Sequence, residues 1–165
     1  MAPSKRTMLF VCLLVAAVAA VVPIAQGGLF GNLVDLIRIQ GRIFCSANGG
    51  ATVGTNGTIL TPAFANATVL LRCGAGNGPV LGTVETNSDG MFSFLLDSSY
   101  FKTAQISSEC RVVVTTPLGS CNATLASAGS LTSILTPLGN TTVGLLPIVN
   151  FGTFGMFNYT NVTIN

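Results

Sequence analysis

The stretch LIRIQGRIFC, residues 36–45, decides the fold because apolar and polar side chains alternate along it. One face carries Ile37, Ile39, Gly41, Ile43 and Cys45, and the other carries Arg38, Gln40, Arg42 and Phe44. A period of two is typical of a β-strand with one face toward the core and one toward water. The stretch therefore predicts such a strand, with Cys45 on its inward face.

Similar short patterns recur downstream. Strands are predicted over 67–73, 80–86, 91–96 and 110–115, with 143–149 and 156–164 as segments that could close the sheet. Asn87-Ser88-Asp89-Gly90 predicts a β-hairpin, since Asp-Gly tolerates the positive φ that such turns need. We expect loops over 46–63 and 116–142, the second with a short helical turn around Leu125–Leu135. About seven short strands and no long amphipathic helix indicate an all-β protein, an antiparallel sandwich or barrel.

The N-terminal 27 residues have the composition of a cleaved signal peptide. Lys5 and Arg6 precede an uncharged apolar run, Pro23 ends that run, and Ala25-Gln26-Gly27 offers small residues for cleavage. The run is shorter than the about 20 residues of a membrane span, so an uncleaved anchor is the weaker alternative. We expect an apolar segment over 28–36, one β domain over 37–165 and no membrane span in the mature protein.

Four cysteines remain once Cys12 has left with the signal peptide. They are Cys45, Cys73, Cys110 and Cys121. An even number in an exported chain predicts a framework of two structural disulfides. The alternation of the strands around Cys73 and Cys110 directs both thiols to the core. Spacing alone leaves all three pairings open.

The mature chain is expected to be electrically neutral and glycosylated. Removing Lys5 and Arg6 leaves five basic and five acidic residues, so the net charge attracts neither nucleic acid nor anionic lipid. Asn-x-Ser/Thr sequons are candidate glycosylation sites and predicted surface positions. They begin at Asn56, Asn66, Asn122, Asn140, Asn158 and Asn161, and we expect several of them, but not all, to carry glycan.

The composition argues against catalysis. No histidine is present, which removes the usual general base and the commonest metal ligand. Asp89 lies in a predicted turn, and Glu85, Asp97 and Glu109 lie at predicted strand ends, where solvated charges are usual. The glycine-rich run over 74–78 lacks the lysine and the following helix of a phosphate-binding loop. We predict no enzymatic activity, no cofactor and no metal.

Aromatic residues gather among glycines near the C-terminus, at Phe151, Phe154, Phe157 and Tyr159. The favoured interpretation is a final strand that fills the core. The alternative is an exposed apolar patch that contacts wax, a microbial surface or another protomer. The apolar residues over 29–37 raise the same question at the other end.

Five stretches together resemble a known family. They are GRIFCS (41–46), ANATVLLRC (65–73), NSDGMFS (87–93), CRVVV (110–114) and TPLGSCNATL (116–125). In their order and spacing around the four cysteines, they resemble the phylloplanins, within the broader olive-pollen-allergen and extensin-like family of secreted plant proteins. The resemblance covers about residues 37–165.

The resemblance implies a fold, two disulfides and a function. The broader family usually has six cysteines, two of which are absent here, and the remaining pairs would be Cys45–Cys121 and Cys73–Cys110. The implied fold is a small, mostly antiparallel β-barrel or sandwich, secreted to the plant surface or apoplast. The implied role is defence, by non-catalytic binding to the surface of fungi or oomycetes or to cuticle and cell-wall components. The oligomeric state stays open.

Two other functions remain as alternatives. The first is an extracellular-matrix or cell-wall protein of growth or pollen development, although the chain has no proline-rich arm. The second is a carbohydrate-binding β-sandwich, although the chain has no tryptophan and only Tyr100 and Tyr159 as tyrosines.

Overall fold

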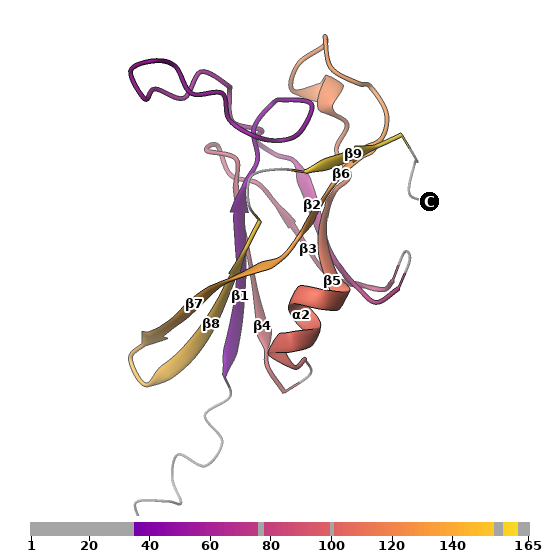
Figure 1. The fold of residues 1–165 in the computed structure, drawn as a ribbon. Coiled ribbons are helices and arrows are strands. Elements are labelled where there is room, and N and C mark those ends of the chain that lie inside the picture. The colour runs from indigo at the N-terminus through magenta and orange to yellow at the C-terminus, as the bar shows by residue number, and fades with distance from the viewer. Residues whose placement is uncertain (1–34, 76–77, 100, 154–156, 162–165) are drawn as a thin grey trace, which may run out of the picture. The chain divides into compact units, whose positions relative to one another are not determined.

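The computed structural model describes residues 35–75, 78–99, 101–153 and 157–161. In these ranges the chain forms nine strands in two sheets, with one short α-helix and one 3-10 turn (Figure 1). The predicted signal peptide over 1–27 lies outside the described residues. So do most of the apolar segment over 28–36, Tyr100 and Phe154.

The first sheet has four strands in the order β4-β1-β8-β7. They are β1 (Leu36–Arg42), β4 (Met91–Asp97), β7 (Thr136–Val143) and β8 (Leu146–Gly152). β1 pairs antiparallel with β4 and parallel with β8, and β7 and β8 form an antiparallel hairpin. The predicted alternation of β1 is confirmed at Ile37 and Ile39, which are buried.

The second sheet has five antiparallel strands in the order β3-β2-β5-β6-β9. They are β2 (Thr68–Cys73), β3 (Val80–Glu85), β5 (Cys110–Val114), β6 (Ser130–Ile134) and β9 (Asn158–Thr160). The predicted all-β class is therefore confirmed, as a two-sheet sandwich rather than a closed barrel.

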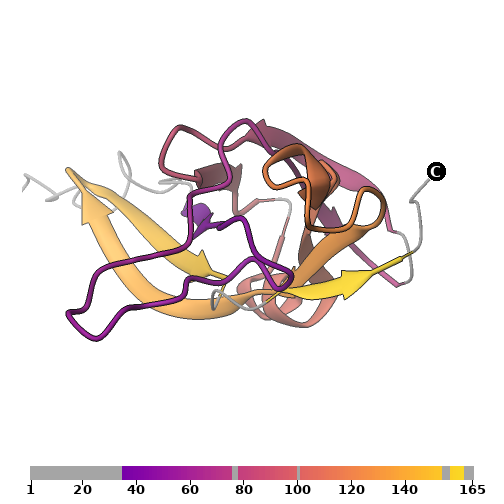
Figure 2. The same ribbon diagram turned by 90° about the horizontal axis from the view of Figure 1, so that it is seen from above.

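One hydrophobic core joins alternate side chains from both sheets. Ile37 and Ile39 of the first sheet and Val69, Leu71 and Val112 of the second are buried in it. The helix α2 (Thr103–Glu109) adds Ile106, which is fully buried. From above, the β7–β8 hairpin and β9 extend on opposite sides of the molecule (Figure 2).

Phe44 does not face water as the alternation predicted. The strand ends at Arg42, and Phe44 is buried in an isolated bridge to Ala63. The alternation rule holds only while the backbone stays in the ladder. The Ile43 amide still donates to the Gly90 carbonyl in the register of β1 and β4, whereas the Phe44 amide donates to the Gly49 carbonyl, so the chain leaves the ladder at Phe44.

The hairpin predicted at Asn87-Ser88-Asp89-Gly90 is a turn between sheets. β3 pairs with β2 in the five-stranded sheet, whereas β4 pairs with β1 in the other. Gly90 has a φ of 73°, and a Cβ there would lie 2.3 Å from the Ile43 carbonyl oxygen. The Asp-Gly signal was right about the turn and wrong about the strands that it connects.

The predicted boundaries after residue 100 need three further corrections. The helical turn lies at Leu118–Ser120 rather than around Leu125–Leu135, and β6 and β7 occupy much of the predicted loop. The helix α2 was not predicted, because seven residues with one buried apolar side chain show no helical period. The strands predicted over 143–149 and 156–164 correspond to β8 (Leu146–Gly152) and to the short β9 (Asn158–Thr160).

Candidate binding surfaces

The structure joins Cys45 to Cys121 and Cys73 to Cys110, the pairs that the resemblance implies. Cys73 and Cys110 lie opposite each other on β2 and β5, and Cys45 and Cys121 connect the loops after β1 and after β5. Cys45, Cys73 and Cys110 are buried and Cys121 is half-buried. Paired, buried cysteines have a structural role rather than a reactive one.

Phe151 and Phe157 do not belong to the exposed patch that was the alternative. Phe151 and Phe157 are buried in the core, with exposed fractions of 1% and 3%, and Phe154 lies outside the described residues. Tyr159 is half-buried, and its hydroxyl oxygen lies within hydrogen-bonding distance of the Ala128 carbonyl oxygen and of Asn161 Oδ1. The favoured interpretation was a final strand that fills the core. The burial of Phe151 and Phe157 agrees with it, although Phe157 precedes the short strand β9.

All six sequon asparagines are exposed to solvent. Two of them also accept hydrogen bonds through Oδ1: Asn122 accepts from the amide and hydroxyl of Thr124, and Asn161 accepts from Tyr159. In both cases the amide nitrogen, which would carry the sugar, is not used by these bonds. The structure is compatible with glycosylation at each position.

The charged side chains are spread over the surface. Glu85 and Asp97 end their strands, Glu109 ends α2, and Asp89 lies in a turn. In the described ranges, no three Cys, Asp or Glu residues gather into a metal-binding group. The described helices are also too short to cross a bilayer.

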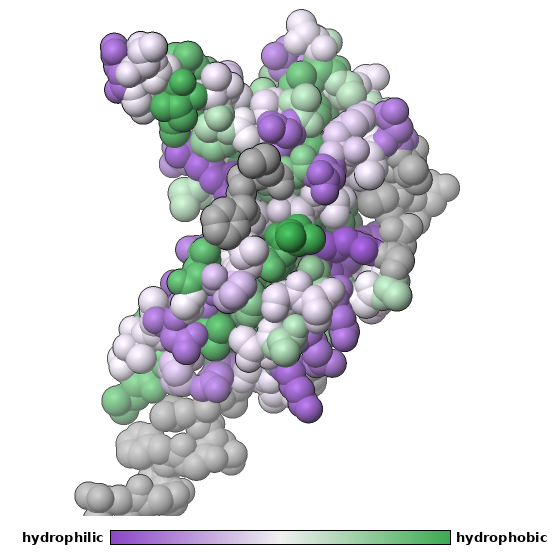
Figure 3. All heavy atoms as spheres, in the orientation of Figure 1, coloured by the Kyte–Doolittle hydropathy of each residue, from purple (hydrophilic) through white to green (hydrophobic). Residues whose placement is uncertain are grey.

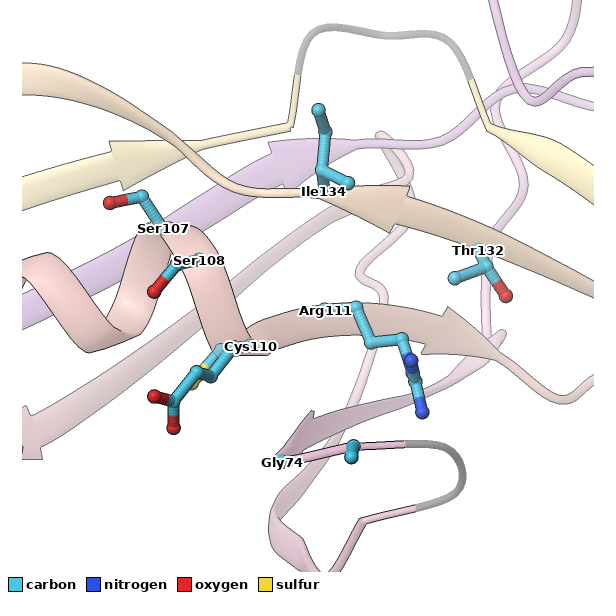
Figure 4. A pocket seen from close by; sticks show the side chains of 9 residues that line it. Gly74, Ser107, Ser108, Cys110, Arg111, Thr132 and Ile134 are labelled. Atoms are coloured by element: carbon cyan, nitrogen blue, oxygen red, sulfur yellow. The ribbon is translucent and has the colours of Figure 1, made fainter.

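A groove of about 600 Å³ lies beside the Cys73–Cys110 disulfide, and we call it the Arg111 groove. Its lining residues are Gly74, Ala75, Ser107, Ser108, Glu109, Cys110, Arg111, Thr132 and Ile134. The Arg111 side chain extends toward Gly74, with the two serines of α2 on one side and Thr132 on the other (Figure 4). The lining includes one acidic and one basic residue, so it shows no preference for a ligand of either charge.

A second groove, of about 430 Å³, lies at one end of the first sheet, and we call it the Met91–Leu138 groove. Its lining residues are Gln40, Gly41, Arg42, Met91, Leu138, Gly152 and Thr153. Met91 and Leu138 are about half-exposed, at 50% and 52%. Arg42 is the one charged residue in this lining.

Further apolar side chains reach solvent in two projecting segments. Val143, Leu145 and Leu146 lie at the tip of the β7–β8 hairpin, and Val53, Ile59 and Leu60 lie in the 46–63 loop. Both segments appear green among polar surface (Figure 3). Contiguous exposed apolar surface marks sites of interaction. Sequence reasoning missed the two grooves and these tips, because exposure depends on which segments pack together.

Two buried disulfides in a small β-sandwich define an extracellular scaffold, since structural disulfides persist outside the cytosol. The family model for phylloplanin, an antifungal protein, matches residues 33–163. Phylloplanin of Nicotiana tabacum is 42% identical over 137 residues, which cover 82% of each chain. The chain therefore belongs to the phylloplanin family, and it is a secreted, extracellular protein.

A solved structure of a pollen allergen also resembles the chain. It is the major plantain pollen allergen Pla l 1, at a TM-score of 0.33 and 14% identity, covering 73% of this chain and 96% of the allergen. This likeness is slight and adds nothing to the sequence matches.

Proposed function

We propose that this protein defends plant surfaces by inhibiting the germination or growth of fungi and oomycetes through non-catalytic binding. The observation that carries the proposal is the match of residues 33–163 to a family of antifungal proteins. Two features of the chain agree with binding: exposed apolar side chains on a disulfide-bonded scaffold, and a sequence without histidine. The partner would be the microbial surface, or cuticle or cell-wall material that the microbe contacts.

A spore-germination assay tests this proposal. Purified mature protein is added to spores in its oxidised form, and in a second arm after reduction in denaturant, alkylation and removal of denaturant. We expect inhibition by the oxidised form alone, because the reduced chain loses the constraint that holds its surface loops. Alkylated serum albumin at equal concentration controls for non-specific protein effects.

The other outcomes separate the alternatives. Equal inhibition by both forms would place the activity on a linear apolar segment rather than on the folded surface. No inhibition by either form at micromolar concentration would contradict the defence role for the species tested. The cell-wall or pollen function would then become the better hypothesis, to be tested by tissue localisation.

We also propose that secretion removes residues 1–27. The basic start, the uncharged run and the small residues before Gly28 support this processing. N-terminal sequencing of the secreted protein tests it, and a sequence starting at Gly28 is expected. A secreted form that starts at Met1 would contradict it.

A further inference from the structure

We propose that the Met91–Leu138 groove is a binding site for one long-chain fatty-acid anion. This inference does not rest on the proposed antifungal function. Four observations carry it: the apolar walls, the glycine floor, the arginine at the groove and the absence of acidic residues from its lining.

The walls of the groove are two large apolar side chains from distant parts of the chain. Met91 is the first residue of β4, and Leu138 belongs to β7, at the other edge of the same sheet. Each exposes about half of its surface, and the two line the same groove. A ligand with an apolar chain would cover both side chains at once.

The floor of the groove includes Gly152, a position that lacks a side chain. A Cβ on Gly152 would lie 2.7 Å from Leu138 Cδ1, so Leu138 rests against the bare backbone there. The register shift of β7 between Pro137 and Gly139 is where Leu138 leaves the regular ladder. At about 430 Å³, the groove is near the lower end of the usual range for ligand sites, which favours a single acyl chain.

The charge at the groove favours an anionic head group. The Arg42 Nε donates to the Asp89 carbonyl oxygen at 2.7 Å, and the guanidinium lies 4.8 Å from the centroid of the Phe44 ring. These contacts hold the guanidinium in place and leave its terminal nitrogens as donors for a carboxylate. Arg38 lies on the same face of β1, and no carboxylate lines the groove.

A second copy of the chain is a poorer occupant. A symmetric contact through this face would bring Arg38 and Arg42 of one copy toward the same arginines of the other. Like charges that meet in this way oppose association. A membrane surface would need a broad cationic area, whereas residues 28–165 carry as many acidic as basic residues.

The test is a fluorescence titration with cis-parinaric acid, an 18-carbon fatty acid whose emission rises in apolar surroundings. We expect saturable binding with a dissociation constant on the order of tens of micromolar and displacement by palmitate. Met91→Gln and Leu138→Gln should each weaken binding by about tenfold, because each removes part of the apolar wall. Leu60→Gln, the same change at an exposed leucine of the 46–63 loop, should leave binding unchanged.

The charge is tested separately with the methyl ester of the probe. Arg42→Gln should weaken binding of the acid by about tenfold and leave binding of the ester unchanged, because the ester has no anionic head. Arg111→Gln, on the other sheet, is the matched control. Circular dichroism of every variant separates loss of binding from loss of folding.

Three results would overturn the proposal. They are uptake of the probe without saturation, an equal loss of binding in the Leu60→Gln control, and binding to phosphatidylglycerol vesicles but not to the free fatty acid. The last result would identify a membrane-contact surface instead. None of these results depends on the germination assay, so either hypothesis can fail alone.

Discussion

Gly41 shows how one residue shapes the end of the first sheet. A Cβ at this position would lie 2.2 Å from Thr153 Oγ1 and 2.6 Å from the Phe92 ring. These two side chains therefore occupy the space that a side chain at position 41 would need. Gly41 is part of the inward face of β1, and its lack of a side chain lets Phe92 fill the core there.

We expect Gly41→Ala to destabilise the fold by about 1–3 kcal/mol, the usual effect of overpacking a filled site. The free energy of unfolding, measured by urea denaturation, checks this. Gly54→Ala is the matched control, because a Cβ there has no atom closer than 3.3 Å. Equal effects of the two substitutions would contradict the explanation from Phe92 and Thr153.

Thr86 is a buried polar residue whose hydroxyl both donates and accepts a hydrogen bond. Its hydroxyl donates to the Phe64 carbonyl at 2.6 Å and accepts from the Ala67 amide at 2.8 Å. The side chain thus satisfies two backbone groups where β3 ends beside β2. Such groups are costly to bury without a partner.

Thr86→Val keeps the shape of the side chain and removes both hydrogen bonds. We expect a loss of stability of about 1–3 kcal/mol, because a buried amide and a carbonyl lose their shared partner. Thermal and urea unfolding measure the loss. Thr83→Val makes the same change at an exposed position of β3 and should have little effect; a similar loss there would show that valine itself is unfavourable in this strand.

At the scale of elements, the two disulfides differ in the length of chain that they close. Cys45–Cys121 spans 76 residues and Cys73–Cys110 spans 37. The disulfides also differ in what they connect. Cys73–Cys110 joins two neighbouring strands, β2 and β5, that are already paired by hydrogen bonds. The first bridge is therefore the stronger constraint on the unfolded chain.

Replacing either pair of cysteines by alanine should cost about 2–5 kcal/mol. Loss of the Cys45–Cys121 bridge should cost about 0.6 kcal/mol more, because its loop is about twice as long. Urea unfolding of the two double variants gives the comparison. A larger loss for the Cys73–Cys110 variant would mean that packing around the alanines, and not loop closure, dominates.

The connection between β3 and β4 explains why this element was predicted only in part. Asn87 Oδ1 accepts from the amides of Asp89 and Met91, which is local turn chemistry that the sequence shows. The Gly90 carbonyl accepts from Ile43, which is distant in the sequence. Local propensity predicts the turn, and distant contacts decide which sheet the next strand joins.

The segment over 130–143 presents the opposite case. Leu135 is buried between β6 in one sheet and β7 in the other, so one nearly continuous stretch serves both sheets. β7 is mostly exposed. Its sequence, TPLGNTTV, lacks the alternation of apolar and polar residues that marks a half-buried strand. The segment forms a strand because it pairs with β8, and not because its sequence has the pattern of a strand.

At the scale of the whole molecule, residues 28–165 carry equal numbers of basic and acidic residues and present exposed asparagines in several surface segments. Because all six sequon asparagines are exposed, glycans there would extend into solvent without displacing core residues. Glycosylation would then add solubility to a chain whose mean hydropathy over all 165 residues is +0.68.

We therefore expect enzymatic deglycosylation of the folded, secreted protein to leave its Tm almost unchanged and to lower its solubility. Peptide mass mapping of the released sites identifies which asparagines carried glycan, and thermal unfolding compares the two forms. A large fall in Tm would mean that a glycan packs against the protein. No mass change at any sequon would contradict the predicted glycosylation.

By itself, the sequence determined the fold class and the inward faces of β1, β2 and β5. Alternation is a local property, so Ile37, Val69 and Val112 could be assigned to the core without knowing their neighbours. The family resemblance, too, depended on residues in order along the chain. The alternation along their strands placed Cys73 and Cys110 on the inward face. The spacing of the four cysteines left the disulfide pairing open.

Only the tertiary structure decided which strands share a sheet and where the grooves lie. The Met91–Leu138 groove combines residues between positions 40 and 153 from four strands that lie far apart in the sequence. Phe151 and Phe157 were likewise compatible with a patch or a core until their packing was known. Burial and exposure depend on contacts between distant segments, and a local pattern cannot specify those contacts.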